Sequence, residues 1–313
     1  MIRQAKLFIV VFQILGLGVW AQGPLQVVTT TGMIGDVTQQ IVGTCGHVDT
    51  LMGPGTDPHA YTATNADVTA LRNADLILYN GLGLEGSLAE VLAALAARQP
   101  TLAYAEAAAP EDARLRGERG GSVDPHVWMD IALWANGIPA LTERLSDLAP
   151  ECRDGFEDRA GAYQDTLTAL ESWVEAAYAT IPEERRVLLT AHDAFGYLGG
   201  AYGVEVVGIQ GISSASEASV GDVRRVADIL VERSIPAIFV ESTINPRTVE
   251  AVVDAAASRG ADVRVGGLLY ADAMGDPGTL EGTYVGMTLH NTTTIVEALG
   301  GSVPPIPEVL PQP

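Results

Sequence analysis

The chain has 313 residues and carries 39 acidic against 18 basic side chains, which gives a formal net charge of −21. This negative excess argues against nucleic acid and anionic membranes as partners and attracts cations at long range. Hydrophobic residues make up 47% of the chain, so it is not a disordered protein and is long enough for two domains with filled cores.

The first 21 residues have the pattern of a secretory signal peptide. Arg3 and Lys6 precede an apolar run from Leu7 to Val19, which is short for a membrane span and typical of an export signal. Val19 and Ala21 favour cleavage after Ala21, and an uncleaved membrane anchor is the alternative. Because no cysteine stands at the cleavage point, we expect a periplasmic or otherwise extracytoplasmic protein without a lipid anchor.

The two cysteines, Cys45 and Cys152, are too far apart for a CxxC redox or zinc motif. Export into an oxidising compartment permits a disulfide between them. Two buried free thiols are the equal alternative, because the sequence does not show whether their geometry allows a bond.

Residues 22–150 alternate short β-branched runs with longer amphipathic runs. This pattern predicts an N-terminal α/β lobe with a mostly parallel sheet flanked by helices. Strands are expected at 25–31, 48–52, 76–80 and 101–105, and helices at 33–42, 65–73 and 84–98, the second capped by Asn65. A polar loop is expected at 106–123, followed by one helix from Asp130 to about Asp147.

Residues 151–181 are predicted to form one long helix. Apolar residues recur there at alternating steps of four and three from Phe156 to Ala177, which indicates a continuous buried stripe. Roughly 30 residues span about 45 Å, so we expect this helix to join two lobes. A solvent-exposed coiled coil is the alternative, but too few heptads are present to favour it.

Residues 182–299 repeat the alternation and predict a second α/β lobe. Strands are expected at 187–191, 204–209, 237–241 and 262–267, and helices at 194–202, 220–233, 246–259 and 284–298. The proline-rich tail at 300–313 is expected to be poorly ordered.

Histidines are scarce, and two of the five stand in matched triplets, Asp57-Pro58-His59 and Asp124-Pro125-His126. Proline stiffens each loop and so preorganises its histidine. His192 and Asp272 follow predicted strands, at the sheet edge where α/β proteins bind ligands. Three imidazoles and a carboxylate complete a tetrahedral metal shell, so the candidate metal ligands are His59, His126, His192 and Asp272.

Other polar residues suit supporting roles better. His47 opens a strand and His290 falls within the last helix, so neither is predicted to bind metal. Asp193 is interpreted as a helix cap. Glu241 ends a strand, where it either orients a ligand histidine or forms a buried salt bridge.

Four ordered motifs together resemble those of the zinc/manganese solute-binding receptors of bacterial ABC importers. They are Gly55-Thr56-Asp57-Pro58-His59, Asp124-Pro125-His126-Val127-Trp128-Met129-Asp130, Ala191-His192-Asp193-Ala194-Phe195-Gly196-Tyr197 and Tyr270-Ala271-Asp272-Ala273-Met274-Gly275. The resemblance covers nearly all of the mature chain. It implies two α/β lobes joined by a long helix, with the same four candidate residues holding one ion in the interlobe cleft.

The resemblance also implies a monomer that delivers its metal to an ABC permease and the ATPase of that permease. Zinc-dedicated relatives often carry a His-rich insertion before the second triplet, whereas residues 111–121 contain no histidine. Manganese-dedicated relatives often have glutamate in place of His192. The donor set favours Zn²⁺ first and Mn²⁺ second, as transported ligand.

A secreted zinc metallohydrolase and a metal-linked adhesin are the alternatives. A hydrolase needs a metal position open to water with a general base beside it, and the sequence has no His-Glu-x-x-His motif. Because four protein ligands would close the shell, we expect no enzymatic activity. Binding to host proteins would distinguish the adhesin.

Overall fold

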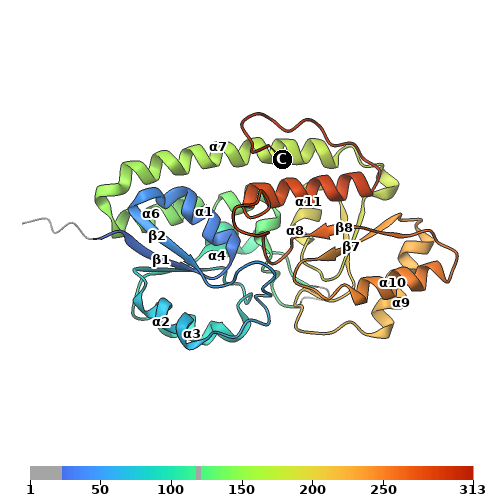
Figure 1. The fold of residues 1–313 in the computed structure, drawn as a ribbon, viewed down its shortest axis with the longest axis horizontal. Helices are drawn as coiled ribbons and strands as arrows, with labels where there is room; N and C mark the ends of the chain where they lie inside the picture. Colours follow the sequence, from blue (N-terminus) through green and yellow to red (C-terminus); the bar gives the residue numbers. More distant parts are fainter. Residues whose placement is uncertain (1–22, 118–120, 313) are drawn as a thin grey trace, which may run out of the picture.

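The computed structural model describes residues 23–117 and 121–312. The predicted signal peptide therefore lies outside the described residues. Two α/β lobes lie side by side, and one long helix runs along both of them (Figure 1). Within the described residues, no helix combines the length and apolar character needed to cross a membrane.

The N-terminal lobe is built on a four-stranded parallel sheet in the order β2-β1-β3-β4. Its central strands β1 and β3 are mostly buried and mostly apolar, with Gln26 as the exposed exception, as is typical of strands covered by helices on both faces. The strands are β1 (Leu25–Thr29), β2 (Gly46–Thr50), β3 (Leu76–Tyr79) and β4 (Thr101–Ala103), and the helices are α1 (Gly32–Val42), α2 (Asn65–Asn73), α3 (Ala89–Ala96), α4 (Tyr104–Ala108), α5 (Ile131–Ala135) and α6 (Ile138–Leu148).

The C-terminal lobe contains two pairs of parallel strands, β5-β6 and β7-β8, with β5 and β7 in contact. The strands are β5 (Val187–Thr190), β6 (Glu205–Gly208), β7 (Ala237–Glu241) and β8 (Arg264–Leu269), and the helices are α8 (Gly196–Tyr202), α9 (Val220–Glu232), α10 (Arg247–Ala257) and α11 (Tyr284–Ala298). The predicted alternation of strands and helices is confirmed in both lobes.

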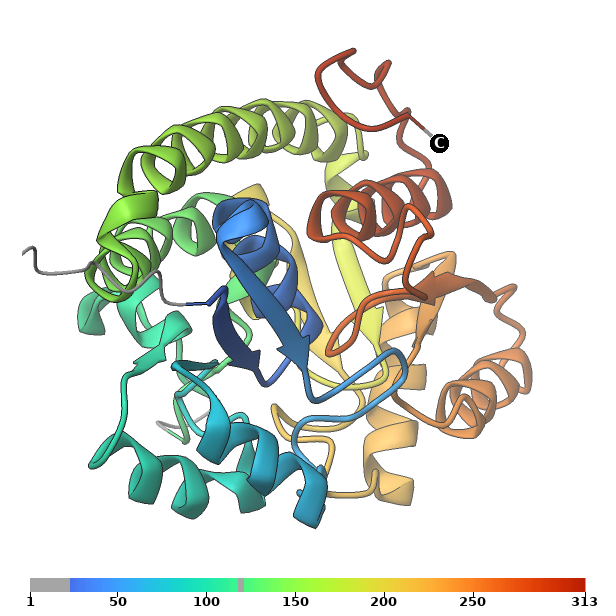
Figure 2. The ribbon, with the colours of Figure 1, turned by 60° about the vertical axis from the view of Figure 1, so that its left-hand side comes forward.

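The predicted long helix is α7 (Arg153–Tyr178), 26 residues long, which spans about 39 Å. It packs against α1 and α6 in one lobe and against α8 and α11 in the other, as Figures 1 and 2 show. A disulfide between Cys45 and Cys152 ties the start of this helix to the end of α1, so the disulfide alternative is correct. Arg159 adds a second tie, because its guanidinium donates to the carbonyls of Ile41 and Val42 at the end of α1.

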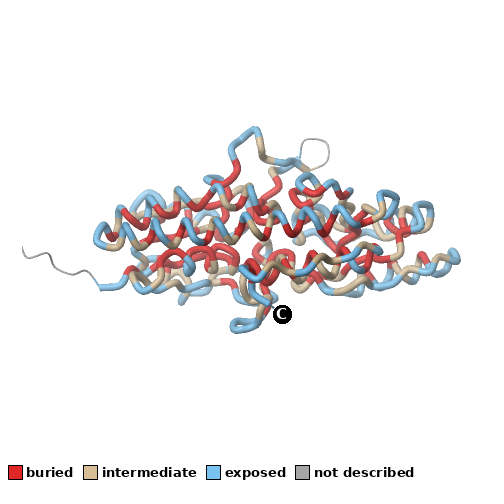
Figure 3. Tube along the Cα trace, turned by 90° about the horizontal axis from the view of Figure 1, so that it is seen from above, coloured by how far each residue is buried: buried red, intermediate tan, exposed pale blue. Residues whose placement is uncertain are grey.

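The core is continuous between the lobes. One cluster of buried apolar residues extends from β1 in the first lobe to α11 in the second, and Figure 3 shows buried segments throughout the length of the molecule. The buried stripe of α7 faces this cluster, which rules out the solvent-exposed coiled coil.

Three local predictions were wrong. The helix expected from Asp130 to Asp147 is broken at Asn136 and Gly137, because Pro139 in the first turn of α6 has no backbone N–H to donate to the carbonyl of Ala135. The cap of α2 is not Asn65 but the residue before it, whose hydroxyl accepts from the Asp67 amide at 3.3 Å. The strand expected at 101–105 ends at residue 103, where α4 begins.

The proline-rich tail was also predicted wrongly, because it packs against α7 (Figure 2). Trp173 donates its indole N–H to the carbonyl of Pro304 at 3.0 Å, and Thr180 Oγ1 accepts from the Ser302 amide at 2.8 Å. Leu310 is only 2% exposed. Burial of apolar tail residues offsets the entropy that a free terminus would keep.

Candidate metal centre

Four polar side chains from four separate loops meet between the lobes. His59 follows β2, and His126 precedes a short turn of helix at 127–129. His192 follows β5, and Asp272 follows β8. Ligand atoms of these four residues all lie within 4.8 Å of one another. The structure thus brings together the candidate residues from the sequence, two from each lobe.

The two Asp-Pro-His triplets fold in the same way. Asp57 Oδ1 accepts the backbone N–H of His59 at 2.9 Å, and Asp124 Oδ1 accepts that of His126 at 3.0 Å. A turn in which an aspartate side chain accepts the backbone N–H of the residue two positions later is an Asx-turn. The proline between the two residues supplies the required φ. The repeated triplet is therefore a local device that turns each histidine inward.

The spacing of the ligand atoms fits a small tetrahedral ion. The Nε2 atoms of His59 and His126 are 3.3 Å apart. Asp272 places Oδ1 3.3 Å from Nε2 of His126 and Oδ2 3.2 Å from Nε2 of His192. Metal–ligand bonds of about 2.0–2.1 Å in a tetrahedron separate the ligand atoms by about 3.3–3.4 Å. These three contacts are close to that spacing, whereas Nε2 of His59 lies farther from Oδ2 of Asp272, at 3.8 Å.

Three of these atoms lack hydrogen bonds. His192 Nε2 and both carboxylate oxygens of Asp272 are buried without a hydrogen-bond partner, although each lies near another member of the group. Leaving such atoms unpaired costs about 1–3 kcal/mol each. A cation bound among them satisfies all of them at once, so the residues present fit a divalent metal.

Two carboxylates hold the outer nitrogens of the histidines. Asp124 Oδ1 lies 2.7 Å from Nδ1 of His126. Glu241 contacts Nδ1 of His192 at 2.5 Å and also accepts the backbone N–H of that histidine at 2.8 Å. A carboxylate that holds Nδ1 leaves Nε2 of the same ring free to face a metal, and it raises the basicity of that Nε2. Glu241 therefore holds the ring of the candidate ligand His192 through a buried ion pair, which is compatible with both of its predicted roles, whereas the contact of Asp124 with a ring nitrogen was not predicted.

The histidines of the metal-free protein differ in basicity. Burial lowers the pKa of His59 to about 4. Burial also opposes a charge on His126 and His192, but carboxylates outweigh it. Asp124 and Asp272 raise the pKa of His126 to about 9, and Glu241 and Asp272 raise the pKa of His192 well above its usual value. Although burial favours the neutral acid at Asp272, the two adjacent histidines hold its pKa well below the usual range.

A chain of hydrogen bonds between the lobes fixes the loop of Asp272. Trp128, in the second histidine motif, donates its indole N–H to the carbonyl of Ala271 at 2.9 Å. The carbonyl of Trp128 accepts the hydroxyl of Tyr284 at 2.7 Å. These buried contacts place the candidate carboxylate of one lobe against the candidate histidine of the other.

His59 is the least buried of the four. A loop of the C-terminal lobe reaches over to its triplet, where Ser214 Oγ donates to Asp57 Oδ2 at 2.6 Å. His126, His192 and Asp272 are at most 2% exposed. Solvent therefore approaches the centre from the side of His59.

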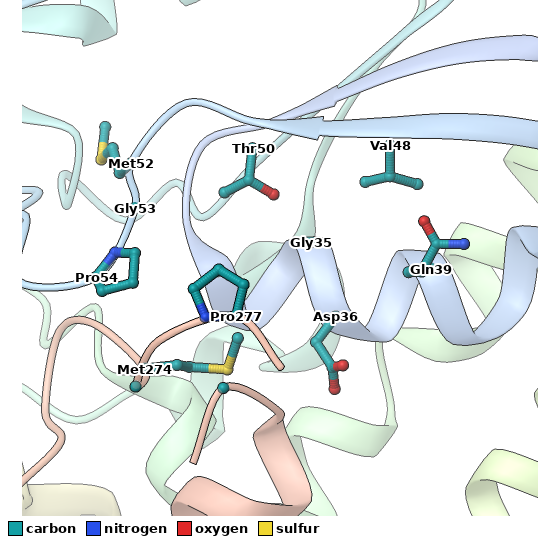
Figure 4. A pocket seen from close by; sticks show the side chains of 13 residues that line it. Gly35, Asp36, Gln39, Val48, Thr50, Met52, Gly53, Pro54, Met274 and Pro277 are labelled. Atoms are coloured by element: carbon teal, nitrogen blue, oxygen red, sulfur yellow. The ribbon is translucent and has the colours of Figure 1, made fainter. Parts of the chain in front are cut away.

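A separate cavity of about 360 Å³ lies between α1, β2 and the segment 274–282. Figure 4 shows Met274 and Pro277 facing Asp36 and Thr50 across it. Asp36 accepts hydrogen bonds from the Tyr284 amide at 3.1 Å and the Tyr163 hydroxyl at 3.3 Å, and burial raises its pKa. The cavity is lined by none of the four candidate ligands.

Three other polar residues, His47, His290 and Asp193, are not among the four that meet. His47 is exposed on β2, and His290 on α11 contacts the carbonyl of Leu268 at 2.9 Å. Both were predicted not to bind metal. Asp193 was interpreted as a helix cap, but α8 begins at Gly196 with Phe195 as its N-cap, so that prediction was wrong.

Two α/β lobes and one long helix that runs along both of them define the two-lobe fold of a solute-binding protein. The profile of the family of periplasmic zinc-uptake complex component A matches residues 27–298. The chain belongs to this family of metal-binding substrate-binding proteins of ABC importers.

Curated relatives carry the names of different metals. The chain is 50% identical over 279 residues to the zinc-binding protein TroA of Treponema pallidum, covering 89% of this chain and 90% of the relative. It is 43% identical over 279 residues to the manganese-binding lipoprotein MntA of Bacillus subtilis, covering 89% and 91%. The crystallised TroA matches with a TM-score of 0.86 over 88% of this chain and 99% of that one. These relatives support the receptor over the hydrolase and the adhesin.

Proposed function

We propose that His59, His126, His192 and Asp272 bind one divalent transition-metal ion as cargo. The observation that carries this proposal is the convergence of the four side chains, whose ligand atoms lie within 4.8 Å of one another, together with the lack of a hydrogen bond at His192 Nε2 and at both oxygens of Asp272. Each histidine presents Nε2, and the carboxylate neutralises part of the charge of the ion. Four protein ligands leave no open position of the kind that a hydrolytic metal requires.

Zn²⁺ is the first choice for this chain and Mn²⁺ the second. Three imidazoles and one carboxylate suit zinc, and zinc outranks manganese at almost any nitrogen and oxygen site. Both metals occur in the names of close relatives. Selectivity therefore depends on how firmly the protein holds its four ligands at the zinc geometry.

The protein is proposed to act outside the cytoplasm as a monomer and to pass its ion to an ABC permease and the ATPase of that permease. Residues 1–21 are proposed to be a signal peptide. MntA of Bacillus subtilis is named a lipoprotein. Here both cysteines of the sequence are joined in the disulfide, whereas several relatives are named lipoproteins.

Metal analysis tests the proposed cargo. Protein purified without added metal, stripped and then titrated, is expected to bind one equivalent of Zn²⁺. Mn²⁺ is expected to compete only at large excess, because the divalent series favours zinc at this donor set. If the protein keeps one equivalent of Mn²⁺ in the presence of equimolar Zn²⁺, the proposed order of preference between the two metals is reversed.

Metal binding is expected to leave the lobes nearly fixed. A single packed helix and a continuous core between the lobes resist the rotation that flexible crossing strands allow. Small-angle scattering curves with and without zinc should therefore superimpose. Gly161→Ala, which stiffens α7 at a position with open space around it, should leave zinc affinity unchanged. A wide rotation on binding, or a loss of affinity in this variant, would show that the helix bends.

A further inference from the structure

One segment of the N-terminal lobe contacts both histidine loops. This segment, residues 80–87, is named here the bracket loop, and it follows β3. Asn80 donates its side-chain amide to the carbonyl of Pro125 at 3.0 Å, directly before His126. Ser87 Oγ donates to the carbonyl of Tyr61 at 2.6 Å, two residues after His59.

The bracket loop also packs its backbone against His59. A Cβ built at Gly86 would lie 2.6 Å from the carbonyl oxygen of His59, closer than real contacts allow. Residues 81, 82, 83 and 86 have positive φ values of 81°, 55°, 85° and 34°. Glycine accepts this conformation without a steric penalty, whereas Leu82 is strained in it.

A buried carboxylate holds the loop in this shape. Glu85 Oε1 accepts hydrogen bonds from the Thr30 hydroxyl at 2.9 Å and from the backbone N–H of Asn80 at 2.5 Å. Glu85 Oε2 accepts the Gly81 amide at 3.1 Å. Glu85 is 2% exposed and Asn80 is fully buried. Such a carboxylate is costly to bury, and its three hydrogen bonds all serve to fix the strand end from which the loop starts.

We propose that the bracket loop is a positioning element that sets the separation of His59 and His126 and thereby the preference for zinc over manganese. The proposal rests on the ligand set proposed above. The two histidines are 67 residues apart in sequence, yet their Nε2 atoms are held 3.3 Å apart, and the bracket loop contacts the chain beside both. A fixed tetrahedral spacing favours Zn²⁺, whereas loosened ligands adapt to the octahedral preference of Mn²⁺.

A matched pair of glycine substitutions tests the proposal. Gly86→Ala and Gly83→Ala both place alanine at a positive φ on the exposed side of the loop, but a Cβ at Gly83 meets nothing within 4 Å. Both variants should lower the Tm of the metal-free protein. Gly86→Ala alone should weaken zinc binding by about 10- to 100-fold, the usual effect of disturbing the support of a ligand. It should also lower the ratio of zinc to manganese affinity.

X-ray absorption of the zinc-loaded variants supplies a readout that general destabilisation does not change. Gly86→Ala should lose or lengthen a histidine ligand, and Gly83→Ala should keep three. Equal affinity ratios and equal ligand shells in the two variants would overturn the proposal. If Gly86→Ala fails to fold, Ser87→Ala removes one hydrogen bond at an exposed hydroxyl, and an unchanged affinity ratio in that variant overturns the proposal equally.

Different variants test the proposed ligand set and the proposed role of the bracket loop, so the two proposals can be rejected separately. If His59→Ala and His126→Ala leave zinc affinity unchanged, the proposed site itself is wrong. If those variants lose binding while Gly86→Ala and Ser87→Ala match the parent protein in affinity ratio, the site stands and only the positioning role is wrong.

Discussion

Alanine at any one of His59, His126, His192 or Asp272 is expected to weaken zinc binding by more than about hundredfold, because losing a direct ligand costs more than losing one of its supports, which costs about 10- to 100-fold. The three remaining ligands keep their places but leave an incomplete shell. Competition with a chelator of known affinity measures the loss.

Three control variants are expected to lose less zinc affinity than the ligand variants, by two different amounts. His47→Ala removes an exposed histidine of β2 that is not part of the cluster and should leave zinc affinity intact. Asp124→Ala and Glu241→Ala remove the carboxylates on the outer nitrogens of two ligands and should fall in the intermediate range of about 10- to 100-fold. A ligand variant that binds zinc as tightly as the His47 control would exclude that residue from the site.

Zinc affinity is expected to rise steeply with pH between about pH 6 and 8. In the metal-free protein the pKa of His126 is about 9 and that of His192 is well above its usual value, so both rings are protonated at neutral pH. Zinc must displace both protons. Each displaced proton changes the apparent affinity by up to tenfold per pH unit, so the combined change approaches about hundredfold per unit.

His59 does not add to this dependence, because burial lowers its pKa to about 4 and it is neutral in the same range. Three histidines with ordinary pKa values near 6.5 would instead give a flat profile above pH 7 and a steep one below it. Calorimetry in buffers of different ionisation enthalpy counts the protons released at pH 7. About two are expected, and a count near zero would contradict the charges assigned to the free site.

The convergence of the four candidate residues could be predicted from the sequence because each of them follows a local signal. Asp-Pro-His encodes an Asx-turn within three residues. His192 and Asp272 follow short apolar strands, so their place at one sheet edge follows from the parallel arrangement. The two lobes follow from the alternation of strand-like and helix-like runs, and α7 follows from its long apolar stripe.

What could not be predicted depends on contacts between distant residues. The bond from Trp128 to Ala271 joins positions 143 residues apart. Asp124 contacts the ring nitrogen Nδ1 of its own histidine, whereas the Oδ1 atom of Asp57 accepts the backbone N–H of His59. This difference depends on how each histidine is packed. The tail binds to α7 through Trp173, and nothing within a proline-rich segment indicates a distant partner.

The central claim is that one ion sits among four side chains contributed equally by the two lobes. Crystals of protein loaded with one equivalent of zinc, measured on both sides of the zinc absorption edge, test it directly. We predict one anomalous peak about 2.0–2.2 Å from Nε2 of each of the three histidines and from a carboxylate oxygen of Asp272. A peak in the cavity beside Asp36, or one that lacks any of the four ligands, would contradict it.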